Sequence, residues 1–228
     1  MWRAISTWTA EVRWIFAKEW RCELRTRYAL NTLGLFAFTT LIVVSMALGG
    51  PVGLSADARP FLAVLLWVIL LFAATAGLPR TFVHEEESRT ATQLRLAARP
   101  SSLFCGKALY NLTLIFALEA LVTPLYLVIL EIPVASPGAF VLSLLAGGFG
   151  LAVGSTLIAA MIAQAGARGP LFAVVAFPIL LPLLKITIAA TLAAVLGEAA
   201  DMHLTLGLLY DAMLTVAGLM LFPAIWNP

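Results

Sequence analysis

Three ionisable residues, Glu119, Lys185 and Asp211, stand inside long apolar stretches of the sequence. A charge in the hydrocarbon of a membrane is costly, so such residues commonly pair with one another or mark a substrate path. Glu119 lies about 18 Å beyond Lys107 and Lys185 about 24 Å beyond Gly169, both near the middle of a core about 30 Å thick. We therefore predict that Lys185 pairs with Glu119 or, failing that, with Asp211. The pair would either hold helices together or line a substrate path.

The histidines His84 and His203 are the remaining candidates for ligand chemistry. The span pattern described below separates them by a membrane, so they cannot share a metal ion. His203 follows Met202, and both are candidate haem ligands, although adjacent residues cannot bind opposite faces of one haem. An ordinary histidine at the membrane interface is the simpler interpretation of His203.

Motifs for catalysis are absent from the sequence. It contains no G-x-x-x-x-G-K-[ST] phosphate-binding string, no H-E-x-x-H, no paired cysteine motif and no G-x-S-x-G. The two cysteines, Cys22 and Cys105, are interpreted as free thiols. We therefore predict no enzyme, no catalytic residue, no metal site and no stably bound cofactor.

The elements that must position these residues are membrane spans. Of the 228 residues 62% are hydrophobic and 11% charged, whereas a soluble domain is about 45–50% apolar and about 25% charged. The sequence predicts an all-α integral membrane protein, a single domain over residues 1–228. A net charge of +2 does not favour nucleic acid as a partner. Six apolar runs are long enough to span a bilayer: 29–49, 61–78, 108–130, 139–163, 171–196 and 204–225.

The basic residues predict the orientation of these spans. Residues 1–28, residues 80–107 and the loop after the fourth span hold twelve Lys and Arg residues, and the three alternate loops hold only Arg59. Loops rich in Lys and Arg stay on the cytoplasmic side. Both termini are therefore expected in the cytoplasm.

Two segments on that side lie outside the expected spans. Residues 1–28 are predicted to form an amphipathic helix at the membrane interface, either a simple anchor or part of a mechanism. Residues 80–107 are predicted to hold a short helix presented to a soluble partner; the alternative is a solvated charged loop. One face of the first segment carries Trp2, Ile5, Trp8, Val12, Ile15 and Phe16, and the other carries Arg3, Glu11 and Lys18.

The long loop has a distinctive order of residues: Phe82, Glu85, Glu86, Glu87, Gln93, Leu94, Pro100 and Lys107. With these residues in this order, the whole chain resembles the haem exporter protein B family (CcmB). This family comprises membrane subunits of an ABC transporter of cytochrome c maturation, within the wider ABC-2 type of export permeases. The sequence departs from the family pattern at Arg89, Thr92 and Lys185, where the family has glycine, glutamate and usually an apolar residue.

The resemblance implies a permease subunit of the bacterial cytoplasmic (inner) membrane that exports or delivers haem. ATP would be bound and hydrolysed by a separate CcmA-like subunit, docked on residues 82–101 as a coupling segment, with residues 1–28 as an elbow helix. The subunit would form a homodimer and work with CcmC-like and CcmD-like membrane subunits and a CcmE-like haem chaperone. The propionates of haem would favour Lys185 or Arg59.

Two alternatives remain open. The first is an ABC-2 export permease for another substrate, such as a lipid, glycan or drug. The second is an assembly subunit that transports nothing and remodels a haem-binding neighbour. The small number of polar residues in the spans is compatible with this alternative, because it does not favour a wide hydrophilic path.

Overall fold

The computed structural model describes residues 2–49, 57–78, 81, 82, 85, 90–165 and 170–226, and these residues form an all-α fold without strands. Six of the helices within this part are long and apolar enough to cross a membrane, as the sequence predicts. The protein is therefore a multi-pass membrane protein. These six helices are α2 (Tyr28–Leu48), α3 (Arg59–Gly77), α6 (Pro100–Ile129), α7 (Pro137–Ala165), α8 (Pro170–Leu196) and α9 (Asp201–Trp226).

Helix α7 forms the centre of the bundle. It packs against α6, α8 and α9. In its most apolar 18-residue stretch, 72% of the residues are buried inside the protein, compared with 22% in the corresponding stretches of α2 and α9. The glycines of α7 allow this close packing. A Cβ atom at Gly147 would lie 2.0 Å from the ring of Trp67 on α3, and one at Gly154 would lie 2.9 Å from Leu180 on α8. The glycine-rich face of the fourth span is thus an internal packing surface.

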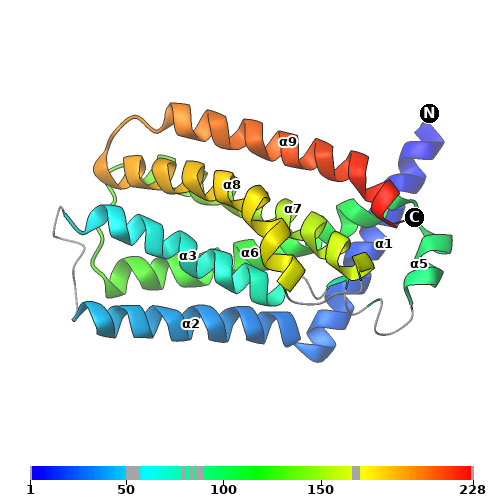
Figure 1. Ribbon diagram of the computed structural model, residues 1–228, viewed down its shortest axis with the longest axis horizontal. Helices are drawn as coiled ribbons and strands as arrows, with labels where there is room; N and C mark the ends of the chain where they lie inside the picture. Colours follow the sequence, from blue (N-terminus) through cyan, green and yellow to red (C-terminus); the bar gives the residue numbers. More distant parts are fainter. Residues whose placement is uncertain are drawn as a thin grey trace.

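Two further helices lie at one end of the bundle. Helix α1 (Trp2–Thr26) crosses this end obliquely, and the short helix α5 (Ala91–Ala97) lies at the same end (Figure 1). Both ends of the chain are found here, so we call it the α1 end (Figure 1). The end of α2, the start of α3 and the α6–α7 and α8–α9 connections lie at the opposite end (Figure 1).

Local backbone chemistry sets the helix boundaries. Arg27 has a left-handed φ of 51° and bends the chain between α1 and α2. Gly197, with φ 80°, ends α8 in the region that favours glycine. Pro100 stands in the first turn of α6, where its missing N–H costs no hydrogen bond.

The third predicted span lies within a longer helix. Helix α6 begins at Pro100 and not near residue 108, so the last part of the predicted loop 80–107 is helical. The reason is tertiary: Ser102, Leu103, Phe104 and Lys107 are buried, and Gly106 lies against Ile15 of α1. A polar stretch that reads as a loop is therefore the first two turns of a membrane helix covered by α1.

Candidate functional site

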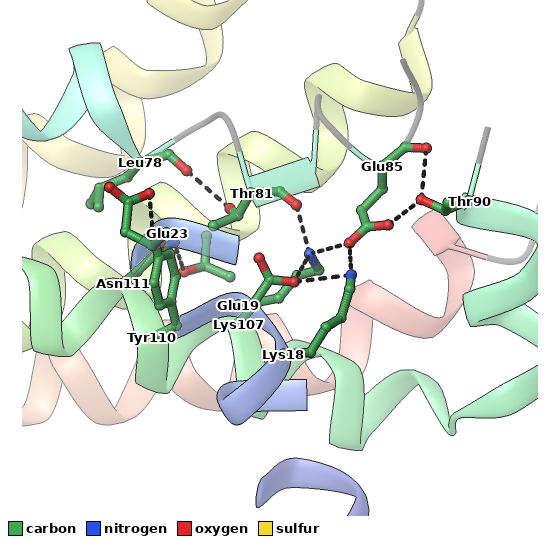
Figure 2. A network of polar contacts seen from close by, with 11 residues as sticks. Lys18, Glu19, Glu23, Leu78, Thr81, Glu85, Thr90, Lys107, Tyr110 and Asn111 are labelled. Carbon is green, nitrogen blue, oxygen red and sulfur yellow. Dashed lines mark hydrogen bonds and ion pairs between the residues drawn. The ribbon is translucent and has the colours of Figure 1, made fainter. Parts of the chain in front are cut away.

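A fully buried lysine, Lys107 of α6, lies at the centre of a polar site at the α1 end. Its Nζ donates to Glu19 Oε1 at 2.7 Å, to the Thr81 carbonyl oxygen at 2.6 Å and to Glu85 Oε1 at 3.3 Å (Figure 2). An ammonium group has three donors, and each has an acceptor here. The three acceptors come from α1 and from the segment that follows α3, so Lys107 joins three parts of the chain.

A second lysine completes the site. Lys18 of α1 bonds to Glu85 and lies 3.4 Å from Glu19 Oε1. Lys18, Glu19, Glu85 and Lys107 thus form a cluster of two cations and two anions, called the ionic cluster below. Thr90 also donates to Glu85 through its hydroxyl group. Buried charges of both signs are tolerated because they neutralise one another at short range.

The electrostatics of the ionic cluster are visible in two pKa shifts. Burial alone would raise the pKa of Glu85, but Lys107, Lys18 and the Thr90 hydroxyl outweigh it and lower the pKa from 4.5 to about 2. Burial alone would lower the pKa of Lys18, but Glu19 and Glu85 raise it above 10.5. Glu85 and Lys18 therefore stay charged across the physiological range.

Hydrogen bonds extend this site toward α2 and α7. Glu23 of α1 accepts from the hydroxyl of Tyr110 at 3.0 Å and from the backbone N–H of Leu30 at 2.9 Å, so it holds the α1–α2 bend against α6. One turn from Lys107, Asn111 donates to Thr156 of α7 at 2.8 Å. The α1 end is thus continuously bonded from α1 to the central helix.

An aromatic cluster lies on the other side of the same segment. Phe82, Phe104, Phe222 and Trp226 have ring centroids 5.4–5.7 Å apart. Leu94 of α5 is buried in the same apolar group, and the Arg95 guanidinium lies 5.1 Å from the Trp226 ring. The segment before α6 is therefore held by charge on the α1 side and by aromatic packing on the α9 side.

The predicted coupling residues divide into two groups in this arrangement. Phe82, Glu85 and Leu94 are buried and anchor the segment. Gln93 is exposed, and Pro100 is half-buried at the start of α6. Glu86 and Glu87 lie outside the described residues. The largest exposed apolar side chain of α5 is one that the sequence reasoning did not select, Leu96, which is 86% exposed.

Helix α1 is more deeply involved than an amphipathic anchor. Glu11 and Lys18 lie on the face predicted to be polar, and both have partners within the protein. Glu11 accepts from the Ser102 hydroxyl and lies 3.8 Å from the Arg99 Nε, and Lys18 belongs to the ionic cluster. One sequence signal could have pointed to Lys18, Glu19 and Glu23: they are charged residues of both signs within six positions of one predicted amphipathic helix.

The predicted intramembrane ion pair is wrong. Glu119 Oε1 and both carboxylate oxygens of Asp211 are buried without a hydrogen-bond partner, and Lys185 is exposed. Glu119 and Asp211 instead press against glycines of α7. A Cβ atom would lie 2.5 Å from Glu119 Oε1 at Gly148 and 2.3 Å from Asp211 Oδ1 at Gly150. Leu183 of α8 faces the same glycine, Gly150, so Lys185, two positions later, points away from both carboxyl groups.

Apolar grooves lie on two faces of the bundle. Asp211 lines a groove of about 630 Å³ between α7 and α9, and Glu119 lines one of about 500 Å³ between α6 and α7. A smaller apolar groove of about 130 Å³ lies between α3 and α8, lined by Phe72, Phe177 and Leu184. These surfaces are suited to lipid tails, apolar ligands or other helices, and they offer few polar contacts.

No metal centre is found in the described part of the chain, where no three His, Cys, Asp or Glu residues gather to hold an ion. His203 is half-buried in the first turn of α9. His84 lies outside the described residues.

Comparison with known proteins agrees with this architecture. The family model described as CcmB protein matches residues 10–225, nearly the whole chain. A curated protein of Bradyrhizobium diazoefficiens, called heme exporter protein B, is 27% identical over 164 residues, 72% of each chain.

Proposed function

The chain belongs to the CcmB family, and from this premise we propose that it is the permease subunit of an ABC transporter complex that exports or delivers haem in cytochrome c maturation. The relative's printed name supports haem as the substrate. The subunit itself is not an enzyme, because ATP is bound and hydrolysed by a separate CcmA-like subunit. Its place is the bacterial cytoplasmic (inner) membrane, with the α1 end and both termini in the cytoplasm.

Charge distribution supports this orientation. The α1 end carries Lys18 and Arg21 on α1, Arg95 on α5, Arg99 just before α6, and Lys107 near the start of α6. Arg59 opens α3 at the opposite end. Segments rich in Lys and Arg remain cytoplasmic.

The observation that carries the coupling proposal is the way α5 is held. Its inner face is fixed by Leu94 in the aromatic cluster and by Glu85 in the ionic cluster just before it. Its outer face presents Leu96, which is 86% exposed, next to exposed Gln93 and Ala97. An apolar side chain held toward the aqueous side suits a protein partner. We assign this face to the ATP-binding subunit.

The bonded network at the α1 end gives the proposed coupling a route. A displacement of α5 moves Glu85 and Phe82 with it. Glu85 acts on α1 through Lys18 and on α6 through Lys107, while Phe82 acts on α9 through Phe222 and Trp226. The elbow helix α1 and the coupling helix α5 thus move as one unit with the ends of two further helices, α6 and α9.

The substrate path is proposed along α8. Lys185 is exposed there, about 16 Å from the end of α8 at Leu196, on the helix that also lines the apolar groove with α3. Haem is largely apolar, so such a surface can accept its ring, and Lys185 can bind a propionate. Arg59 at the mouth of the same helix pair is a second candidate for a propionate. Glu119 and Asp211 carry the wrong charge for this role.

The working complex is proposed to contain two copies of this chain, CcmA-like ATP-binding subunits, and CcmC-like and CcmD-like membrane subunits. A CcmE-like chaperone would accept the haem. The non-transporting alternative is supported by one observation, the almost wholly apolar lining of the grooves.

The test is affinity purification of the solubilised chain from its native membrane, with every partner identified by mass and the visible spectrum recorded. We expect an ATP-binding subunit, cytochrome-maturation proteins and a Soret band. Leu96→Glu should reduce the recovered ATP-binding subunit at least tenfold. Met202→Glu is the matched control, because Met202 is 66% exposed at the opposite end, and it should leave recovery unchanged.

Each other outcome has a definite meaning. Recovery of the ATP-binding subunit without haem or maturation proteins would favour an ABC-2 permease for another substrate. Absence of any ATP-binding subunit, or full recovery with Leu96→Glu, would refute the coupling role of α5.

A further inference from the structure

The outer half of α7 is exposed between two neighbouring helices. Near the α1 end α6 and α9 touch, because Phe104 packs on Gly218, where a Cβ atom would lie 2.4 Å from its ring. Toward the opposite end, Leu142 and Leu145 of α7 are 55% and 44% exposed. The α7–α9 groove and the α6–α7 groove lie on either side of this ridge and share Phe116 and Leu145 in their walls. Together they form one surface, called the α7 trough here.

Each half of the α7 trough contains one buried carboxyl group at mid-membrane depth. Asp211 is 3% exposed and Glu119 is 5% exposed. Asp211 stands ten residues after the start of α9 at Asp201, and Glu119 ten residues before the end of α6 at Ile129. Both therefore lie about 15 Å from the outer helix ends, half of a core about 30 Å thick.

Three of the four oxygens of these carboxyl groups lack a hydrogen-bond partner among the described residues. Both oxygens of Asp211 and Oε1 of Glu119 have no hydrogen bond, and no ion pair involves either residue within the described ranges. Lipid acyl chains would cover the trough but would supply no donor, which leaves the cost of burial uncompensated. The occupant that satisfies the site must bring positive charge or donors to the membrane midplane.

The walls of the trough are shaped for a helix. Ala120 of α6, Ala146 of α7 and Ala212 of α9 line it near the two carboxyl groups. Small residues around a polar group are the usual signature of close helix packing in membranes, because they let backbones approach while the polar group bonds across the interface. Apolar side chains elsewhere in the walls would contact the rest of the incoming helix.

We propose that the α7 trough is the docking site for a transmembrane helix of another membrane subunit, which places a Lys or Arg side chain at mid-depth against Asp211, with Glu119 in the adjoining groove as a second acceptor. This surface is distinct from α5, so docking of the membrane subunit and of the ATP-binding subunit are separable events.

Site-specific cross-linking in native membranes tests the proposal. A photoreactive benzophenone side chain replaces Leu208, which is 63% exposed and lines the trough, or Leu35, which is 68% exposed on α2. We expect the probe at Leu208, and not that at Leu35, to cross-link one other membrane protein. The cross-linked peptide should lie in a span that contains Lys or Arg.

Charge dependence then separates a specific site from a chance neighbour. Asp211→Asn should lower the cross-link yield at least tenfold, whereas Asp211→Glu and the exposed control Asp201→Asn should stay within twofold. Asp211→Lys combined with an acidic residue in place of the partner's basic one should restore it. Recovery of the ATP-binding subunit, measured on the same samples, should not change and also reports folding.

The proposal is overturned by cross-links to lipid only, to a second copy of this chain, or to a span without a basic residue. An unchanged yield with Asp211→Asn would overturn it as well. Loss of the ATP-binding subunit from the wild-type chain would instead count against the proposed function.

Discussion

The ionic cluster and the α7 trough both bury ionisable groups, yet only the ionic cluster is complete among the described residues. In the ionic cluster every charge has an opposite partner, and Lys107 has three acceptors at 3.3 Å or less. In the trough, Glu119 and Asp211 lie against glycines of α7. Glu119 Oε1 and both carboxylate oxygens of Asp211 have no hydrogen-bond partner there.

This difference separates two uses of buried charge. A completed cluster fixes several chain segments in one arrangement, and removing one member leaves its partners uncompensated. An incomplete site costs free energy in the isolated chain and is retained where another molecule supplies the missing group. A completed cluster therefore suits the internal coupling of helices, and an incomplete site suits the binding of another subunit.

The largest effect on stability is expected from Lys107→Met, which removes the central lysine of the ionic cluster. It removes the fully buried cation between Glu19 and Glu85 and leaves two carboxylates with only the partly exposed Lys18, so the free energy of unfolding should fall by about 3–5 kcal/mol. Thermal unfolding in detergent measures this loss. Arg99→Ala is the matched control: Arg99 is exposed and 3.8 Å from Glu11, so its loss should cost less than about 1 kcal/mol. Equal effects of the two would mean that the cluster does not hold the fold.

An intermediate effect is expected from acid. The folded-state pKa of Glu85 is about 2, below its ordinary value of 4.5. Its contribution to stability is therefore fully present above about pH 5 and is lost as pH falls toward 2. The unfolding temperature should drop over this window, and Glu85→Gln should start lower and drop less. Parallel curves for the two chains would show that the acid sensitivity comes from other groups.

The smallest effect, and one of opposite sign, is expected in the trough. Glu119→Met removes a buried carboxyl group that lacks a partner on Oε1, so the isolated chain should gain about 1 kcal/mol of stability. The same thermal measurement in detergent checks it. A loss of stability comparable to that of Lys107→Met would indicate that Glu119 has a bonding partner within the chain and would remove the contrast between the two regions.

Much of the fold could be predicted from the sequence, because membrane spans depend on composition. A run of about 20 apolar residues is a helix in a bilayer whatever surrounds it, and all six predicted spans are present. The short helix α5 also follows from local pattern. The boundary at Pro100 could not be predicted, since residues 100–107 are helical next to α1, which covers them.

The candidate sites show the same division more sharply. Glu119, Lys185 and Asp211 were identified from sequence alone, because a charge in an apolar run needs no structure to be noticed. Their pairing was wrong, because it depends on which face each helix turns toward its neighbours. Lys107 was noticed only as a motif residue, and its bonds to Glu19 and Glu85 join residues 88 and 22 positions apart.

The sequence by itself therefore determined the environment of each segment. Six segments are apolar enough to lie in lipid, and two charged segments lie together at one end. It did so because transfer free energy is summed along the chain and requires no knowledge of neighbours. Only the tertiary structure decided which charges meet, since a rotation of α8 by half a turn would exchange Leu183 for Lys185 at Gly150. Partnership between charges is short-ranged and directional, and it exists only once the helices have packed.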